Sequence, residues 1–127
     1  MRRAAIVLLL AAAFPVACTN SCKPTITTAR DSGAVIAHDA LSSGSVTARL
    51  VTEKHGPLEL RSISFTIKGD DVGSATTNGQ GIATLDLKKR PLDLAHAVTA
   101  KTFEASFLGD FGYCGSNGEA KFRIVKR

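Results

Sequence analysis

The sequence predicts an all-β fold built as a sandwich or barrel of short strands, and three observations predict it. From Pro24 onward, apolar and polar side chains alternate with a period of two, which is typical of half-buried strands. Stretches rich in Gly, Asp and Asn, such as "KGDDVG" and "NGQG", separate the alternating segments and indicate turns. Several short strands at this spacing favour a sandwich or barrel over a fold with long helices.

The first 17 residues are predicted to be a cleaved signal peptide that precedes this fold. Met1-Arg2-Arg3 comes before an apolar run over residues 4–14, and small residues follow it. The run has 11 residues, whereas a membrane-spanning helix needs about 20. The alternative is a buried helix of the folded domain, which the two arginines disfavour. We therefore expect export.

The motif "PVAC", residues 15–18, is similar to a bacterial lipobox, in which small residues precede a cysteine that receives lipid. Ala17 and Cys18 match that pattern and Val16 fits it, whereas Pro15 departs from it because leucine is usual there. The similarity implies that Cys18 is acylated, that residues 18–23 form a tether, and that the protein is anchored to a membrane of the cell envelope. The alternative is ordinary cleavage nearby, which leaves Cys18 as a thiol or disulfide partner of a secreted protein.

Residues 24–127 are expected to form one domain of ordinary size. The full chain carries 16 basic and 11 acidic residues, a net charge of +5, which falls to +3 without Arg2 and Arg3. The basic residues are scattered along the chain, so together with export they argue against a nucleic-acid partner.

Taken in order, the five alternating segments each place three side chains on an inner face. These are Val46, Ala48 and Leu50; Ile63, Phe65 and Ile67; Ala83, Leu85 and Leu87; Phe103, Ala105 and Phe107; and Ala120, Phe122 and Ile124, with Val125 an outward exception. The four phenylalanines of this set should share one core. Two stretches are less regular: residues 26–40 suggest a broken first strand that crosses between two sheets, and residues 90–100 suggest a short helix over 92–97 or a loop.

Residues 56–113 resemble bacterial immunoglobulin-like domains of the invasin type. The matching motifs are Gly56-Pro57, Phe65-Thr66-Ile67 with Gly69, "GSATTN" at 73–78 with "GIAT" at 81–84, and "FEASFLGDFGY" at 103–113, which is similar to the family's "tAsfaGDxxY" signature. The likeness extends over residues 24–127 and implies an immunoglobulin-like β-sandwich of about seven strands. Asn78-Gly79 is a strong hairpin-turn dipeptide, and Gly69 and Gly81 suit tight turns.

Cys114 departs from the family pattern, and the resemblance implies a partner for it. In an immunoglobulin-like sandwich the first strand begins at the same pole as the last hairpin loop, which would bring Cys22 and Cys114 together. If Cys18 carries lipid, these two thiols also remain alone in an oxidising compartment, where free thiols are rare. Pairing of Cys18 with Cys114, or two free thiols, are the alternatives.

The chain shows no motif of a catalytic or metal site. The three histidines His38, His55 and His96 are far apart, and none has ligands at the spacing of a zinc site. His38-Asp39 lacks a nucleophile-elbow sequence nearby, and Asp70-Asp71 suits a turn better than a calcium loop. We expect no metal, no cofactor and no enzymatic activity; a small hydrolase is the less favoured alternative.

Two exposed segments are candidates for contact with a partner. The loop 109–118 carries Phe111 and Tyr113, whose rigid rings lose little entropy on binding, although the rings equally suit a cap over the domain's own core. The basic cluster Lys88, Lys89 and Arg90 suits anionic headgroups or cell-wall polymers, or simply a solvated loop.

We expect a non-catalytic binding, adhesion or structural module of the bacterial envelope, with a protein or polysaccharide ligand or with self-assembly through an edge strand at 121–127. The alternative is an inhibitor or ligand-binding protein that acts through the loop 109–118.

Overall fold

The computed structural model describes residues 22–38, 40–89, 99–110 and 112–127. The expected signal peptide, the lipid-bearing Cys18 and the expected helix at 92–97 lie outside these residues. Regular structure within them is almost entirely β-strand: β1 (Thr25–Ala37), β2 (Ala40–Thr52), β3 (Gly56–Pro57), β4 (Ser62–Ile67), β5 (Asp70–Thr76), β6 (Ile82–Asp86), β7 (Thr102–Phe107) and β8 (Ser116–Lys126). A short 3-10 turn, η1 (Leu87–Lys89), follows β6. The all-β prediction is confirmed.

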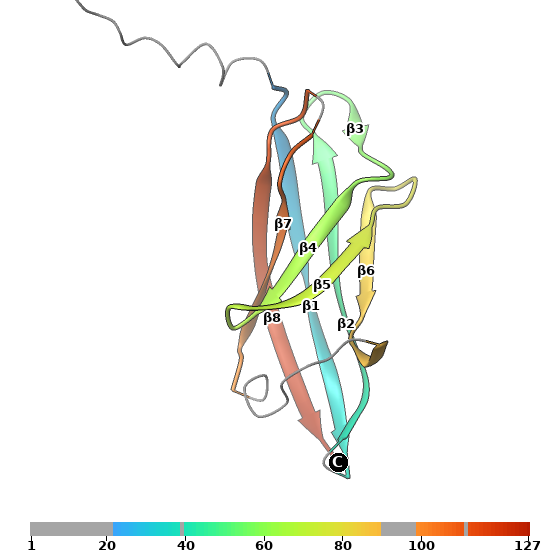
Figure 1. Ribbon diagram of the computed structural model, residues 1–127, viewed down its shortest axis with the longest axis vertical. Coiled ribbons are helices and arrows are strands. Elements are labelled where there is room, and N and C mark those ends of the chain that lie inside the picture. Colours follow the sequence, from blue (N-terminus) through green and yellow to red (C-terminus); the bar gives the residue numbers. More distant parts are fainter. Residues whose placement is uncertain (1–21, 39, 90–98, 111) are drawn as a thin grey trace, which may run out of the picture.

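The described strands form one curled sheet in the order β3-β2-β1-β8-β7-β4-β5, and β6 pairs with β2 beside β3. Figure 1 shows β1, β2 and β8 running along the long axis of the molecule, while β4 and β5 cross them obliquely. The sequence suggests about seven strands, and the structure has eight because a two-residue strand, β3, pairs with the end of β2. The curl brings side chains of β2 and β6 against those of β4 and β7 in one cluster.

Strands β1 and β8 join the two halves of this sheet. β1 pairs antiparallel with β2 from Thr25 opposite Thr52 to Ala37 opposite Ala40, with a bulge between Arg30 and Gly33. β8 pairs antiparallel with β7 over residues 116–121 and parallel with β1 over residues 122–126. The expected broken first strand is therefore one bulged strand. The expectation of an edge strand at 121–127 stays a prediction: residues 122–126 pair with β1 on one side, and no strand of the described residues pairs with them on the other.

The inner faces predicted for β2, β4, β6 and β7 are confirmed. Phe65, Phe103, Phe107 and Phe122 are all buried in the same core cluster. The ring centroid of Phe103 lies 6.2 Å from that of Phe65 and 6.4 Å from that of Phe122. Only β8 departs in part: Ala120 and Ile124 are half-buried, since this strand changes partners midway. Val125 faces outward, 44% exposed, as the alternation predicts.

The turn after β5 carries the chain from one half of the sheet to the other. The Gly81 N–H donates to the carbonyl of Asn78 (2.9 Å), and the side-chain oxygen of Asn78 accepts from the N–H of Gln80 and Ile82. β5 pairs with β4 and β6 pairs with β2, so the prediction of a hairpin at Asn78-Gly79 is wrong. Gly81 has φ +77, and a Cβ there would lie 2.4 Å from the carbonyl oxygen of Leu50, which explains the glycine.

Candidate functional site

The two cysteines of the folded part lie at one end of the molecule and are bonded to each other. Their Cα atoms are 5.1 Å apart, within the normal range of disulfides. The Lys23 N–H donates to the carbonyl of Gly112 (2.7 Å), and the Cys114 N–H donates to the carbonyl of Lys23 (2.9 Å). The pairing expected from the sequence is therefore present. We call this end, formed by Cys22, Lys23, the turn 53–55 and the described residues of the loop 108–115, the disulfide pole.

Side-chain hydrogen bonds fasten the loop of the disulfide pole to the start of β1. The hydroxyl of Thr25 donates to the carbonyl of Cys114 (2.7 Å) and lies 2.8 Å from the hydroxyl of Ser116. The hydroxyl of Thr27 lies 2.7 Å from the same Ser116 oxygen. Together with the disulfide, these contacts hold the loop rigidly against the sheet.

The ring of Tyr113 contacts two cationic side chains of the same chain. The Lys23 Nζ lies 5.6 Å and the Arg61 guanidinium carbon 5.4 Å from its ring centroid, distances at which cations are attracted to aromatic faces. Arg61 Nε in turn lies 3.4 Å from the Asp110 carboxylate. Tyr113 is half-buried against the core, which favours the capping role over an open contact. Phe111, the other aromatic residue of the predicted contact loop, lies outside the described residues.

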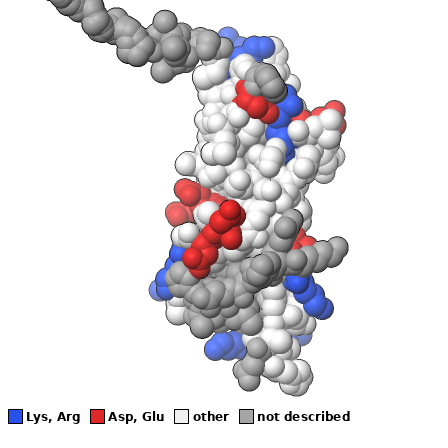
Figure 2. Space-filling model, in the orientation of Figure 1, with Lys and Arg blue, Asp and Glu red and all other residues white. Residues whose placement is uncertain are grey.

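The outer surface of the disulfide pole combines basic and apolar side chains. Lys23, Lys54 and His55 are exposed, and with Cys22, Pro24, Thr52 and Glu53 they line a cavity of about 430 Å³. Leu108, which follows the last residue of β7, is 87% exposed. Figure 2 shows basic side chains at this upper end of the molecule.

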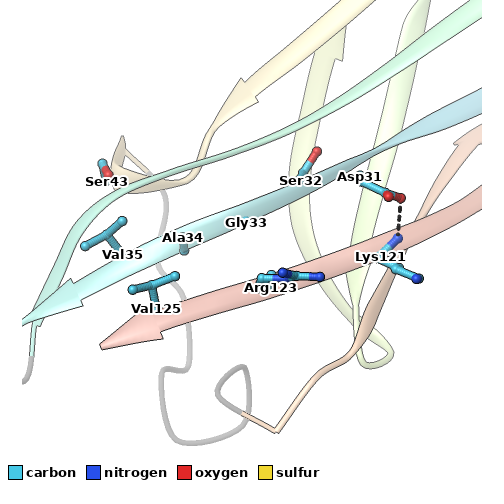
Figure 3. Close-up of a pocket in the computed structure, with 9 residues that line it drawn as sticks. All are labelled: Asp31, Ser32, Gly33, Ala34, Val35, Ser43, Lys121, Arg123 and Val125. Atoms are coloured by element: carbon cyan, nitrogen blue, oxygen red, sulfur yellow. Dashed lines mark hydrogen bonds between the residues drawn. The ribbon is translucent and has the colours of Figure 1, made fainter. Parts of the chain in front are cut away.

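A second hollow lies along β1 and β8 (Figure 3), in the halves of these two strands that are further from Cys22 and Cys114. It has a volume of about 360 Å³ and is lined by Asp31, Ser32, Gly33, Ala34, Val35, Ser43, Lys121, Arg123 and Val125. We call it the β1–β8 groove.

The bulge in β1 shapes the β1–β8 groove. Asp31 turns its carboxylate toward β8 and accepts the N–H of Lys121 (3.1 Å). Gly33 permits close approach of the strands, because a Cβ there would lie 2.2 Å from the carbonyl oxygen of Arg123. The side chains of Lys121 and Arg123 are exposed, and neither forms an ion pair with another described residue. The groove therefore offers two cations beside the paired Val35 and Val125.

The predicted basic cluster is only partly described. Lys88 is exposed, and its N–H donates to the Asp86 carboxylate (2.9 Å). The backbone of Lys89 belongs to η1, whereas Arg90 lies outside the described residues. The cluster follows the end of β6 that lies away from the disulfide pole, because Ile82 pairs with Arg49 and Asp86 with Ser45.

The histidines do not come together. His55 lies at the disulfide pole, whereas His38 occupies the turn after β1 at the opposite end of the molecule, and both side chains are exposed. His96 is outside the described residues. Asp70 and Asp71 begin β5, and the Asp71 carboxylate accepts the N–H of Gly73 (2.9 Å). In the part of the chain that the structure describes, no group of three His, Cys, Asp or Glu is arranged to hold a metal ion. Nor does that part contain a helix long and apolar enough to cross a bilayer.

Sequence reasoning missed the β1–β8 groove. Alternation placed Lys121 and Arg123 on the outer face of the last strand, but it gave no partner strand for them. The available signal was "DSG" at 31–33, turn-forming residues inside a strand pattern. A glycine in such a position often marks a bulge or a close approach of two backbones, and both occur here.

Comparison with known proteins finds no match for this chain among protein-family models, curated protein sequences or solved structures.

Proposed function

We propose that the chain is a non-catalytic binding module of the bacterial envelope, with an immunoglobulin-like sandwich held at the membrane by an acylated Cys18. The observation that carries the proposal is the disulfide at Cys22, which fastens the folded domain four residues after the cysteine of the lipobox-like motif. A tether this short and this firmly attached suits a domain held by one end at a membrane.

The pairing of the strands supports an immunoglobulin-like sandwich of the kind the invasin-type resemblance implies. Strands β1, β2 and β6 pair in one group and β4, β7 and β8 in another. These groups correspond to strands A, B, E and C, F, G of the immunoglobulin arrangement. β5 differs from strand D of the constant-type domain, because it pairs with β4 rather than β6.

The disulfide also supports export. Disulfides persist in oxidising compartments outside the cytosol and are rare inside it. A signal peptide over residues 1–17 would bring the chain to such a compartment, where Cys22 and Cys114 can form their bond.

The anchoring is tested by intact-mass measurement and membrane fractionation of the chain exported from a bacterial host. The wild-type protein should begin at Cys18, carry the mass of acyl chains and sediment with membranes. Cys18→Ser should lose the acyl mass and remain soluble, whereas a Cys22→Ser, Cys114→Ser double variant should keep it. Unchanged processing and sedimentation of Cys18→Ser would refute the anchor.

We propose the β1–β8 groove as the surface that binds the partner. Its two cations, Lys121 and Arg123, form no ion pair with a described residue and outnumber the single carboxylate of Asp31, so together with the hydroxyl and apolar side chains they suit an anionic polysaccharide. The groove lies on the half of the molecule away from the tether, so a partner can reach it when the chain is anchored.

Binding to alginate, a polysaccharide of carboxylate-bearing sugars, tests the groove. Lys121→Glu with Arg123→Glu should weaken binding at least tenfold, because both cations become repulsive. Lys88→Glu with Lys126→Glu makes the same change of net charge at residues that do not line the groove, and it should change the affinity for alginate little. Neutral dextran, which carries no carboxylates, should not bind. Equal losses in the two double variants would show that net charge, not the groove, governs binding.

A further inference from the structure

The length of the chain between Cys18 and Cys22 limits how far Cys18 can lie from the disulfide pole. An extended chain advances at most about 3.6 Å per residue, so the Cα atoms of Cys18 and Cys22 are at most about 14 Å apart. Cys22 is fixed by the disulfide, and Lys23 is fixed by two backbone hydrogen bonds to the loop 108–115. An acyl chain on Cys18 therefore brings the pole itself to the membrane surface.

Leu108 gives this pole an apolar side chain that the fold holds outward. It is 87% exposed, whereas its neighbour Phe107 is 4% exposed and points into the core. The next residue, Gly109, lies close to the returning chain, because a Cβ on it would lie 2.9 Å from the Gly115 nitrogen and from the Tyr113 oxygen. The exposed Leu108 is thus attached to a tightly packed loop.

The basic side chains of the pole complement a bilayer that contains anionic lipids. Lys23 and Lys54 line the cavity beside Cys22, and Glu53 is the single carboxylate among its lining residues. Lysines next to an anionic leaflet each strengthen binding several-fold. An end of the molecule that carries both an exposed leucine and lysines has the composition of helices that lie in the membrane interface.

From the tether length, the outward Leu108 and the lysines together, we infer that the disulfide pole rests on the bilayer. The Leu108 side chain enters the interfacial layer, and Lys23 and Lys54 face anionic headgroups. The inference rests on the acylation of Cys18 proposed above. The loop 109–118, which the sequence predicts as a contact surface, then contacts lipid. The β1–β8 groove faces away from the membrane.

The chain contains no tryptophan, so single reporters can be introduced. Leu108→Trp places one at the pole. Val125→Trp is the matched control, on a side chain that is 44% exposed and about 33 Å further along β8 than Gly115. The full acylated protein is bound to vesicles of phosphatidylglycerol and phosphatidylethanolamine that carry brominated acyl chains.

The Leu108→Trp emission should shift to the blue and be quenched at least twofold by the brominated lipid. The Val125→Trp emission should remain that of an exposed residue and be quenched by aqueous acrylamide. His55→Trp leaves Leu108 unchanged, and its emission should also be quenched by the brominated lipid. This variant shows that the indole introduced at position 108 is not itself the cause of membrane contact. Adding Lys23→Glu and Lys54→Glu to Leu108→Trp should reduce the lipid quenching.

Three results would overturn the inference and are distinguishable from one another. If acylated Leu108→Trp protein sediments with vesicles while its indole stays as exposed as that of Val125→Trp, the anchor holds and the pole stands clear of lipid. If the indole of Leu108→Trp is shielded without vesicles as concentration rises, a second copy covers the pole. If the protein carries no acyl mass and does not sediment, the proposed anchor fails and the inference fails with it.

Discussion

Leu60 is one of three residues other than glycine that have positive φ in the described part of the chain. Its φ is 61°, in the left-handed region that a bulky residue rarely adopts, and its side chain is 73% exposed. Backbone bonds from the Leu60 N–H to the carbonyl of Thr77 (2.9 Å) and from the Thr77 N–H to the carbonyl of Arg61 (2.8 Å) hold it there. The Arg61 N–H also donates to the Thr77 hydroxyl (2.9 Å), so three hydrogen bonds between residues 60–61 and Thr77 hold the strained conformation in place.

Replacing Leu60 should therefore stabilise the protein. Leu60→Asn keeps the backbone conformation at lower strain, because asparagine tolerates the left-handed region, and should raise the free energy of unfolding by about 1 kcal/mol. Urea unfolding measures the change. Leu108→Asn removes another exposed leucine, one without positive φ, and should shift the free energy of unfolding by less than about 0.5 kcal/mol. Equal changes in the two variants would contradict the strain at Leu60.

Phe103 lies at the centre of the core, in contact with two other aromatic rings. Phe103→Ala removes a side chain that is 1% exposed and leaves a cavity, which should cost about 3–5 kcal/mol of unfolding free energy. Thermal and urea unfolding measure this loss, with Leu108→Ala as the exposed control. A loss below about 1 kcal/mol would mean that the inner face of β7 is not packed as described.

At the scale of elements, the seam between β1 and β8 decides how the sheet closes. Two glycines allow the strands to approach closely: a Cβ on Gly33 would lie 2.2 Å from the Arg123 oxygen, and one on Gly118 would lie 2.3 Å from the Thr27 oxygen. Neither glycine has positive φ. They are needed here for space, not for an unusual backbone conformation.

Gly33→Ala should consequently push β1 and β8 apart. Because the obstructing atom is backbone, the expected cost is about 1–3 kcal/mol of unfolding free energy, together with faster amide exchange in residues 123–127. Gly79→Ala is the matched control, since the nearest atom to its added Cβ is a carboxylate oxygen of Glu59 at 3.7 Å. Similar stability of the two variants would show that the seam tolerates separation.

The sequence predicted well which side chains of each strand face the core, and it predicted poorly which strands pair with each other. Alternation is a local property, so Ile63, Phe65 and Ile67 could be placed inward without knowledge of their neighbours. Pairing depends on residues far apart in the sequence, which is why the two partners of β8 and the β1–β8 groove were missed. The signal at Asn78-Gly79 predicted a turn correctly but could not tell whether the flanking strands pair.

For the whole molecule, the Cys22–Cys114 bond closes a loop with a sequence separation of 92 residues. The chain-entropy model gives about 4–5 kcal/mol of stabilisation for a loop of this size, as an upper estimate. Reduction should lower the free energy of unfolding and first speed amide exchange of Lys23 and Cys114, whose N–H groups bond across the pole.

Urea unfolding with and without reductant measures the effect of this bond. The Cys22→Ser, Cys114→Ser double variant is the control. Its free energy of unfolding should equal that of the reduced wild-type protein and should not change when reductant is added. Identical unfolding of oxidised and reduced wild-type protein would show that the bond adds nothing to stability.

The bond between Cys22 and Cys114 also determines how the molecule responds to tension. A force applied between Cys22 and Arg127 passes from Cys22 directly into Cys114 and along the 13 residues that follow it, most of them in β8. A strand is already nearly extended, at about 3.3 Å per residue against a maximum of about 3.6 Å. Pulling therefore lengthens this path by only a few ångströms, while β1 to β7 stay outside it and remain folded. Without the bond, the same force would run through β1 and strip the strands from the sheet one after another.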